Sequence, residues 1–251
     1  MMKILLICVI ALSFSQTTLA ASNDIKEKIK SAMASDLRTT KETNRDQNRK
    51  PVETLTFFGL QDDMTVLELF PGGGWYTKIL APVMNENGKL YEAMGTDAIA
   101  ALSAHDDFSQ MEILDVKANM TKPPGELFYS LSDQTLDLGV SNLDIIFTFR
   151  NYHNFSKNTR TTINDAAFNA LRSGGIYAVV DHTRRHMQAT SNENRRRIDP
   201  VLAIKEIQAA GFILEDYATL HYRLDDELRY EVGRKTVAGN TDRFTLKFRK
   251  P

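Results

Sequence analysis

Two short polar segments in the second half of the chain carry side chains suited to acid–base chemistry. They are RNYHN, Arg150–Asn154, and DHTRRH, Asp181–His186. Because histidine titrates near neutral pH, His153 or His182 could take a proton from a substrate hydroxyl, amine or activated carbon. Each histidine could instead be a hydrogen-bonding strut that only supports its own loop. The sequence leaves both roles open.

The same two segments could hold a metal ion, since imidazole and carboxylate groups suit zinc or iron. His153, Asp181, His182 and His186 are the candidate ligands. However, no helix-spaced ligand pair such as HExxH accompanies them. We therefore expect no metal in this protein.

A third segment of chemical interest is VLELFPGGGWYT, Val66–Thr77, with three consecutive glycines. A glycine turn at the end of a strand lets a ligand approach bare backbone N–H groups near the positive end of the following helix. The segment therefore predicts a ligand site. A purely structural turn is the alternative.

Arginines are grouped at two further places. Arg195, Arg196 and Arg197 could clamp an acidic substrate, although three adjacent arginines before a helix are usually a solvated face. Arg45 and Arg49 lie four residues apart, and on a helix they could fold the N-terminal segment over the ligand site.

The elements that must position these segments alternate between short apolar runs and helical patterns from Met64 onward. This alternation is typical of βαβ units around a parallel sheet. The expected strands are Thr65–Leu69, Lys89–Ala93, Met111–Asp115, Leu143–Phe147 and Ile176–Asp181. The clearest helices are expected at Trp75–Met84, Asn158–Arg172 and Ile198–Ala210. In such a sheet, reactive groups gather at the carboxyl ends of the strands, so the glycines and both histidine segments should share one crevice.

Two later stretches, Phe212–Tyr222 and Thr241–Phe248, are expected to form an antiparallel pair. The predicted fold class is therefore α/β: a Rossmann-like, doubly wound sheet of about seven strands, mostly parallel with an antiparallel C-terminal strand, and helices on both faces. The long loop that contains Pro123, Pro124 and Gly125 is expected to be a binding loop or a lid.

The first 20 residues are typical of a secretory signal peptide. Lys3 is followed by an apolar run and then by Ala20 and Ala21, and we expect cleavage after Ala20. The run is shorter than the roughly 20 residues that span a bilayer. The domain prediction is a signal peptide over 1–20, a helical segment over 21–63 that packs on the core, and one domain over 64–251. The expected location is the periplasm or the exterior.

Charge and composition limit the partners. The chain has 31 basic and 32 acidic residues, and removal of residues 1–20 leaves a formal charge of −2. Such a balance gives no strong field for nucleic acid. The only cysteine, Cys8, lies in the predicted signal peptide. We expect a small-molecule substrate, no nucleic acid and no stable membrane insertion.

The segment ELFPGGG, Glu68–Gly74, resembles the first motif of the class I methyltransferases that use S-adenosylmethionine. Five phrases resemble a bacterial group of predicted methyltransferases, some of which carry signal peptides: RDQNRKP, TVLELFPGGGWYTKILAP, DIIFTFRNYHN, LRSGGIYAVVDH and AAGF. The resemblance covers nearly the whole chain after residue 20. It implies that S-adenosylmethionine is the cofactor.

The resemblance and the residues beside its motifs define a candidate site. The expected cofactor-binding residues are Glu68, Phe70, Gly72, Gly73, Gly74, Tyr76, Glu92, Met94 and Asn151, and the expected catalytic residues are His153, Tyr152 and His182. Two positions depart from the family pattern. Phe70 stands where the first glycine is usual, and Met94 stands where an acidic residue usually holds the ribose. Glu92 could take over that contact or be a plain strand-end carboxylate.

Three functions remain open from the sequence. The first is an exported methyltransferase of unknown acceptor, although S-adenosylmethionine is made in the cytoplasm. The second is an exported small-molecule binding protein that kept the fold and lost the methyl donor, as Met94 would indicate. The third is a metal-assisted hydrolase or isomerase that uses the histidines.

Overall fold

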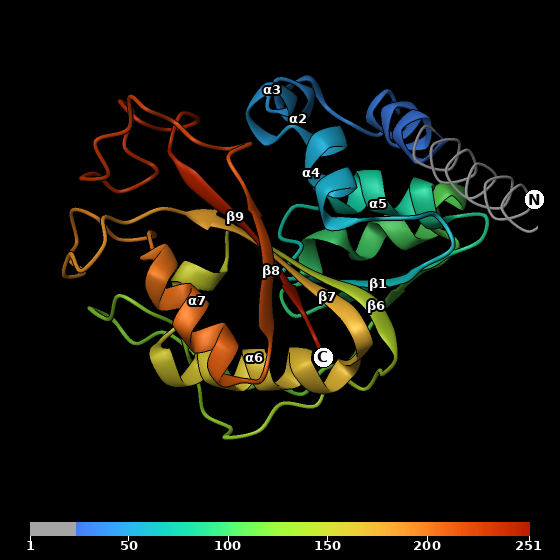
Figure 1. Cartoon of the computed structure of the whole chain (residues 1–251). Coiled ribbons are helices and arrows are strands. Elements are labelled where there is room, and N and C mark those ends of the chain that lie inside the picture. Colours follow the sequence, from blue (N-terminus) through green and yellow to red (C-terminus); the bar gives the residue numbers. More distant parts are fainter. Residues whose placement is uncertain (1–23) are drawn as a thin grey trace, which may run out of the picture.

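The structure is a computed structural model that describes residues 24–251 (Figure 1). The predicted signal peptide and Cys8 lie outside these residues. Within the described range, no helix combines the length and the hydrophobicity needed to cross a membrane.

A seven-stranded sheet with the order β3-β2-β1-β6-β7-β9-β8 forms the centre of the molecule (Figure 1). Its strands are β1 (Thr65–Leu69), β2 (Lys89–Ala93), β3 (Met111–Ile113), β6 (Leu143–Phe149), β7 (Leu171–His182), β8 (Ile213–Ala218) and β9 (Arg243–Arg249). All neighbouring pairs are parallel except those made by β9, which runs antiparallel between β7 and β8. The predicted fold class is confirmed.

Helices cover both faces of this sheet. They are α2 (Thr40–Thr43), α3 (Asp46–Arg49), α4 (Pro51–Phe58), α5 (Thr77–Met84), α6 (Lys157–Ala170) and α7 (Pro200–Ala209), preceded by a helix over residues 24–33. Successive residues of β1 point to opposite faces. Val66 belongs to the core that includes Leu55 of α4 and Leu80 of α5. Leu67 belongs to the core that includes Ile163 of α6 and Ile207 of α7.

The predicted element boundaries differ from the observed ones for local reasons. Helix α7 begins at Pro200 rather than at residue 198, because Asp199 caps it by accepting from the backbone N–H of Val201. Strand β7 begins at Leu171 rather than at Ile176, so that it includes Gly174 and Gly175. Leu171 pairs with Leu143, and the register then shifts until Ile176 continues the ladder.

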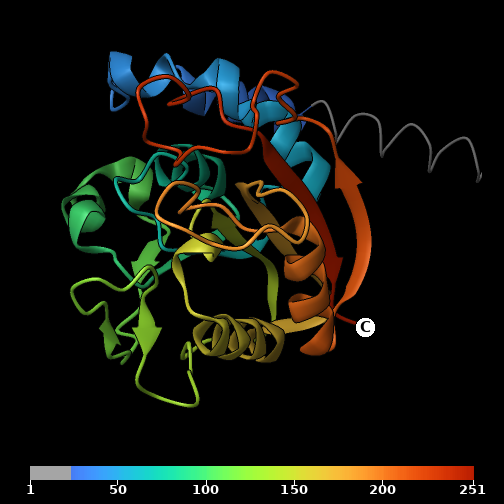
Figure 2. The same cartoon turned by 90° about the vertical axis from the view of Figure 1, so that its left-hand side faces the viewer.

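Four segments gather above the carboxyl ends of the parallel strands. Figure 2 shows the long loop between β8 and β9 beside the N-terminal helices, and the side chain of Arg223 donates to the side chain of Asn48 there at 2.9 Å. The other two segments are the loop after β7 and a small hairpin made by β4 (Met120–Thr121) and β5 (Ser130–Leu131). The hairpin occupies the loop that the sequence predicted as a binding loop or lid.

Candidate functional site

The glycine turn follows β1 directly and contains several residues in the left-handed region. Phe70 has φ +58°, Gly72 +59° and Gly74 +73°. A Cβ atom on Gly72 or Gly73 would meet nothing within 4 Å, whereas a Cβ on Gly74 would lie 2.7 Å from Cγ2 of Ile99. Gly72 and Gly73 therefore leave room for a ligand, and Gly74 is needed for packing.

A cavity of about 340 Å³, here called the glycine pocket, opens beside this turn. Of the predicted cofactor-binding residues, Glu68, Phe70, Gly72, Gly73 and Asn151 line it. The side-chain amide of Asn151 donates to the carbonyl oxygens of Phe70 and Phe149, both at 3.0 Å. Asn151 therefore ties the end of β6 to the glycine turn.

Two buried carboxyl groups lie side by side under this pocket. Glu68 and Glu92 are paired in the parallel register of β1 and β2. Burial raises the pKa of Glu68 to about 7, against the hydroxyl of Thr77, which donates to it at 2.9 Å. Burial, and then the charge of Glu68, raise the pKa of Glu92 well above its usual value. The shared site therefore favours the protonated form of Glu92.

Neither Glu92 nor Met94 lines the glycine pocket in the described structure. Neither carboxyl oxygen of Glu92 has a hydrogen-bond partner among residues 24–251. Met94 has φ +64° and packs in the core, where its side chain is almost inaccessible. The structure thus places both residues behind the pocket wall and gives no support to a ribose contact from either.

The aromatic residues after the glycines are core residues. The ring of Tyr76 stacks on Phe149 at 3.6 Å between centroids and does not reach the pocket, contrary to its expected role as a cofactor contact. Trp75 does line the pocket. However, the guanidinium groups of Arg49 and Arg38 lie over its ring, at 4.2 and 5.0 Å from the centroid.

His153 and Asp181 form a dyad at the ends of β6 and β7. Nδ1 of His153 lies 2.5 Å from Oδ1 of Asp181, and the backbone N–H of His153 donates to Oδ2 at 2.8 Å. Asp181 is fully buried. In the neutral form of the His153 ring, this arrangement holds the proton on Nδ1 and leaves the lone pair on Nε2, as a general base requires.

His182 supports the dyad from the neighbouring position. Its ring centroid is 5.6 Å from that of His153, and its Nδ1 lies 2.9 Å from the hydroxyl of Thr241. Burial, followed by the charges of His153 and Arg150, lowers the pKa of His182 well below its usual value. His182 is therefore a neutral side chain on the pocket wall.

Tyr152 and His186 are not part of this arrangement. Tyr152 is buried in the core, where its hydroxyl donates to Glu206 at 3.2 Å and accepts from Asn164 at 2.9 Å, so its expected catalytic role has no geometric basis. His186 pairs with Asp199 instead of Asp181. Over residues 24–251, no three His, Cys, Asp or Glu side chains come together as metal ligands would.

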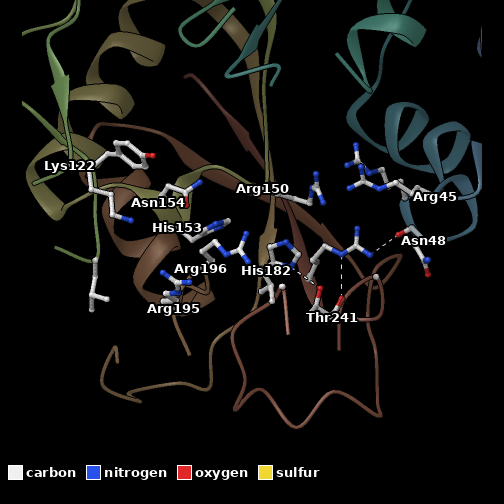
Figure 3. A pocket seen from close by; sticks show the side chains of 17 residues that line it. Arg45, Asn48, Lys122, Arg150, His153, Asn154, His182, Arg195, Arg196 and Thr241 are labelled. Carbon is white, nitrogen blue, oxygen red and sulfur yellow. Dashed lines mark hydrogen bonds between the residues drawn. The ribbon is translucent and has the colours of Figure 1, made fainter. Parts of the chain in front are cut away.

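A larger cavity of about 660 Å³, here called the basic pocket, lies between the dyad and the N-terminal helices (Figure 3). Its described lining contains no aspartate or glutamate. It contains both histidines and seven cationic residues: Arg45, Arg49, Lys122, Arg150, Arg195, Arg196 and Arg243. Arg45, Arg49 and Arg150 also line the glycine pocket, so the two cavities adjoin.

The sequence reasoning missed part of this lining. Arg150 belongs to RNYHN, but the sequence predicts roles only for the residues that follow it. Arg243 opens β9 and Lys122 lies in the β4–β5 hairpin, and neither was singled out. Arg197, expected to share a role with Arg195 and Arg196, is instead fully buried against Asp226. The position of Arg150 just after a parallel strand was the one available signal.

Comparison with known proteins identifies the fold of the chain. No protein-family model matches the sequence, and no match exists among curated proteins. Among solved structures, the chain is similar to a SAM-dependent methyltransferase from Aquifex aeolicus, with a TM-score of 0.58 and 16% identity over 89% of this chain and 97% of that one. It is also similar to the glycopeptide N-methyltransferase MtfA complexed with S-adenosylmethionine, with a TM-score of 0.53 and 13% identity over 82% and 95%.

A third similar structure carries a different activity. It is the [4+2]-cyclase SpnF, with a TM-score of 0.54 and 15% identity over 81% of each chain. At these identities the likeness concerns the fold alone. The chain has the Rossmann-like fold of S-adenosylmethionine-dependent methyltransferases.

Proposed function

We propose that this protein is an S-adenosylmethionine-dependent methyltransferase that acts on a small molecule. The observation that carries the proposal is the pair of adjoining cavities at the carboxyl ends of the parallel strands. One cavity has an open glycine backbone for a donor, and the other has a histidine–carboxylate dyad for an acceptor. Group transfer needs donor and acceptor held together in this manner.

The glycine pocket fits the cofactor in most respects. Gly72 and Gly73 leave their backbone open to a ligand, and Glu68 and Asn151 supply polar groups beside them. Arg45 and Arg49 on the same wall would meet the cofactor carboxylate. The ribose has fewer partners. Among the described lining residues, Glu42 is the one carboxylate besides Glu68, and Lys78 donates to it at 3.0 Å.

The residues of the chain would prepare the acceptor. Asp181 holds His153 in the tautomer whose Nε2 can take a proton from an acceptor hydroxyl or amine. His182, kept neutral by burial, adds no competing charge next to it. The cofactor, when bound, supplies an electrophilic methyl group, and the chain contributes positioning and proton removal.

Calorimetry with S-adenosylhomocysteine and S-adenosylmethionine tests this function. We expect binding by the natural protein, and a loss of at least about tenfold in affinity in Gly72→Val, whose side chain would enter the open space. Gly139→Val is the matched control, because Gly139 also has a positive φ of 72° and open surroundings but lies outside the glycine pocket. Equal losses in both variants, or no binding by the natural protein, would contradict the proposal.

Loss of methyl-donor use is the second candidate, and the burial of Met94 and Glu92 favours it. A ribose without a carboxylate partner lacks charge-assisted hydrogen bonds worth on the order of 1.5–3 kcal/mol, or roughly ten- to a hundredfold in affinity. The cyclase among the similar structures is named for an activity other than methyl transfer on this fold. If neither the natural protein nor Met94→Asp binds either nucleoside, this candidate replaces the first.

We also propose that the protein is exported. The support is the pattern of residues 1–20, with a lysine, an apolar run and small residues at the end. N-terminal sequencing of the protein from the producing cell should find a chain that begins near Ala21. A chain that begins at Met1 or Met2 would exclude cleavage.

A further inference from the structure

Four guanidinium groups meet where the glycine pocket joins the basic pocket. They belong to Arg45, Arg49, Arg150 and Arg243, and we call them the arginine cluster. Arg45 and Arg49 come from the N-terminal helices, Arg150 follows β6, and Arg243 opens β9. Figure 3 shows Arg45 and Arg150 on the wall that faces Lys122, Arg195 and Arg196. Positive charge therefore lies on opposite sides of one cavity.

The arginine cluster has no counterion in the described structure. Across residues 24–251, none of its four members forms an ion pair with a carboxylate. The carboxylates whose charges act on the arginine cluster are committed elsewhere. Glu42 pairs with Lys78, Asp181 accepts from the backbone and ring of His153, and Asp242 accepts from the backbone N–H of Arg223.

The described structure supplies the arginine cluster with few hydrogen-bond acceptors, none of them charged. Arg49 is 4% exposed, and its Nε has no partner among the described residues. The Nε of Arg150 is in the same condition. Arg243 is 5% exposed and reaches only carbonyl oxygens, those of Asn48 at 2.9 Å and Thr241 at 3.4 Å. A buried cation without an acceptor is costly, so these groups are retained against their contribution to stability.

Burial and mutual repulsion lower the pKa values of the arginine cluster. Burial, followed by the charges of Arg150, Arg45 and Arg243, lowers the pKa of Arg49 to about 8. Burial, together with the charges of neighbouring arginines, lowers the pKa of Arg150 to about 10 and that of Arg243 to about 10. All three groups remain mostly charged at neutral pH. The whole chain is nearly neutral, with 31 basic and 32 acidic residues. The excess of positive charge is therefore local to the basic pocket.

We propose that the basic pocket binds a small polyanion, a molecule with at least two negative charges on phosphate or carboxylate groups. Guanidinium groups bind such oxygens through paired, charge-assisted hydrogen bonds. A volume of about 660 Å³ suits a small molecule rather than a polymer. One part of this inference rests on the proposed function: if the protein is a methyltransferase, this polyanion is its acceptor, held beside Nε2 of His153.

Two properties set the polyanion apart from the methyl donor. The donor carries a single carboxylate and a sulfonium cation, which cannot compensate four guanidinium groups. The charges of Arg195 and Lys122 lie across the basic pocket, away from the glycine pocket that would hold the donor. Arg196 lies on the same side and pairs with Glu231. Polyanion binding should therefore persist when S-adenosylhomocysteine is present.

The test uses the full chain in a low-salt chloride buffer, with inorganic pyrophosphate, citrate and acetate as probes. Calorimetry should detect pyrophosphate, citrate or both, and acetate at least about tenfold more weakly. Binding of pyrophosphate alone would identify phosphate recognition, and binding of citrate alone would identify carboxylate recognition. The affinity should fall as salt is added. Absence of binding by both polyanions would overturn the inference.

Arg150→Gln separates a ligand role from a structural one. It should weaken polyanion binding at least about tenfold and, without polyanion, should raise the melting temperature by relieving repulsion. Arg229→Gln is the control with the same charge change, because Arg229 is exposed on the β8–β9 loop outside the basic pocket. Equal affinities in the natural protein and Arg150→Gln would overturn the inference. Arg195→Gln, at an exposed position, gives the same comparison if Arg150→Gln does not fold.

A titration with S-adenosylhomocysteine completes the design. If the nucleoside binds and no polyanion does, the inference fails and the proposed function stands. If a polyanion binds and the nucleoside does not, the proposed function fails and the polyanion site stands.

Discussion

Arg197 and Arg49 are both nearly inaccessible, with exposed fractions of 1% and 4%, and their surroundings are opposite. Arg197 donates to both carboxylate oxygens of Asp226, at 2.8 and 3.0 Å, and to the carbonyl oxygens of Thr183 and Tyr230. Arg49 has the face of Trp75 and three other arginines around it. The charge of Arg197 is therefore compensated inside the fold, whereas Arg49 has no carboxylate partner among the described residues.

The difference distinguishes an architectural cation from a functional one. Arg160 follows the rule of Arg197, since it donates to both oxygens of Glu206 at 2.6 and 2.8 Å. These compensated pairs hold loops and helices in place. Four arginines without a carboxylate partner gather where the two cavities meet. Arg184 is also buried without such a partner, but it lines another cavity and donates to the hydroxyl of Thr190 and to the carbonyl oxygen of Arg197. Burial of one cation therefore does not identify a binding residue, whereas several uncompensated cations around one cavity indicate a site for an anion.

The largest expected effect comes from breaking the compensated pair. Arg197→Met should lower the free energy of unfolding by about 3–5 kcal/mol, because Asp226 would keep a buried charge without its partner. Urea denaturation at neutral pH measures this loss. A change below about 1 kcal/mol would show that the pair does not hold the β8–β9 loop, and the contrast with Arg49 would then disappear.

The glycine turn also contains one position that is needed for packing, Gly74, and one that is open to a ligand, Gly72. Gly74→Val should destabilise the protein by about 2–4 kcal/mol, because the new side chain would clash with Ile99 in addition to the cost of a positive φ. Gly72→Val bears only the φ cost, about 1–2 kcal/mol. Thermal denaturation of both variants checks the order. Equal losses would mean that neither glycine is reserved for a ligand.

Acidification should add a further cation beside the arginine cluster. His221 accepts from Thr245 at 2.7 Å and donates to the carbonyl oxygen of Arg49 at 2.9 Å, and burial followed by Arg243 lowers its pKa to about 4. The unfolded chain binds this proton near pH 6.5, so stability is full above pH 6.5 and is lost as the pH falls from 6.5 to 4. The loss should reach roughly 3 kcal/mol at most.

Unfolding at a series of pH values in His221→Gln provides the check. The variant should show a flatter dependence between pH 6.5 and 4 than the natural protein. The remaining slope belongs in part to His182, whose pKa is also lowered by burial. An unchanged slope would place the acid sensitivity outside the surroundings of Arg49.

The smallest change in the free energy of unfolding is expected for Arg49→Met. Removal of an uncompensated cation should change the free energy of unfolding by less than about 1 kcal/mol in chloride, because the lost contact with Trp75 offsets the relieved repulsion. The same change should abolish stabilisation by pyrophosphate or citrate. A loss as large as that of Arg197→Met would mean that Arg49 is also architectural.

The sequence by itself determined the order of elements and the location of the crevice. A strand, three glycines and a helix in succession require a tight turn at the carboxyl end of β1, and the alternation of apolar residues fixed the seven strands within a few residues. These features depend on neighbours close in the chain. The local pattern also predicted that His153 and Asp181 lie at the ends of two adjacent parallel strands. It did not predict the hydrogen bond between them.

Only the tertiary structure decided which polar residues face a ligand. Glu92, Tyr76 and Tyr152 stand within or beside the motifs, yet each is turned into the core, because the direction of a side chain depends on what packs against it. The compensation of a charge depends on residues still further away. Arg243 reaches the backbone of Asn48 across 195 positions, and Arg197 finds Asp226 across 29. Identical arginines therefore become a strut in one place and an anion site in the other.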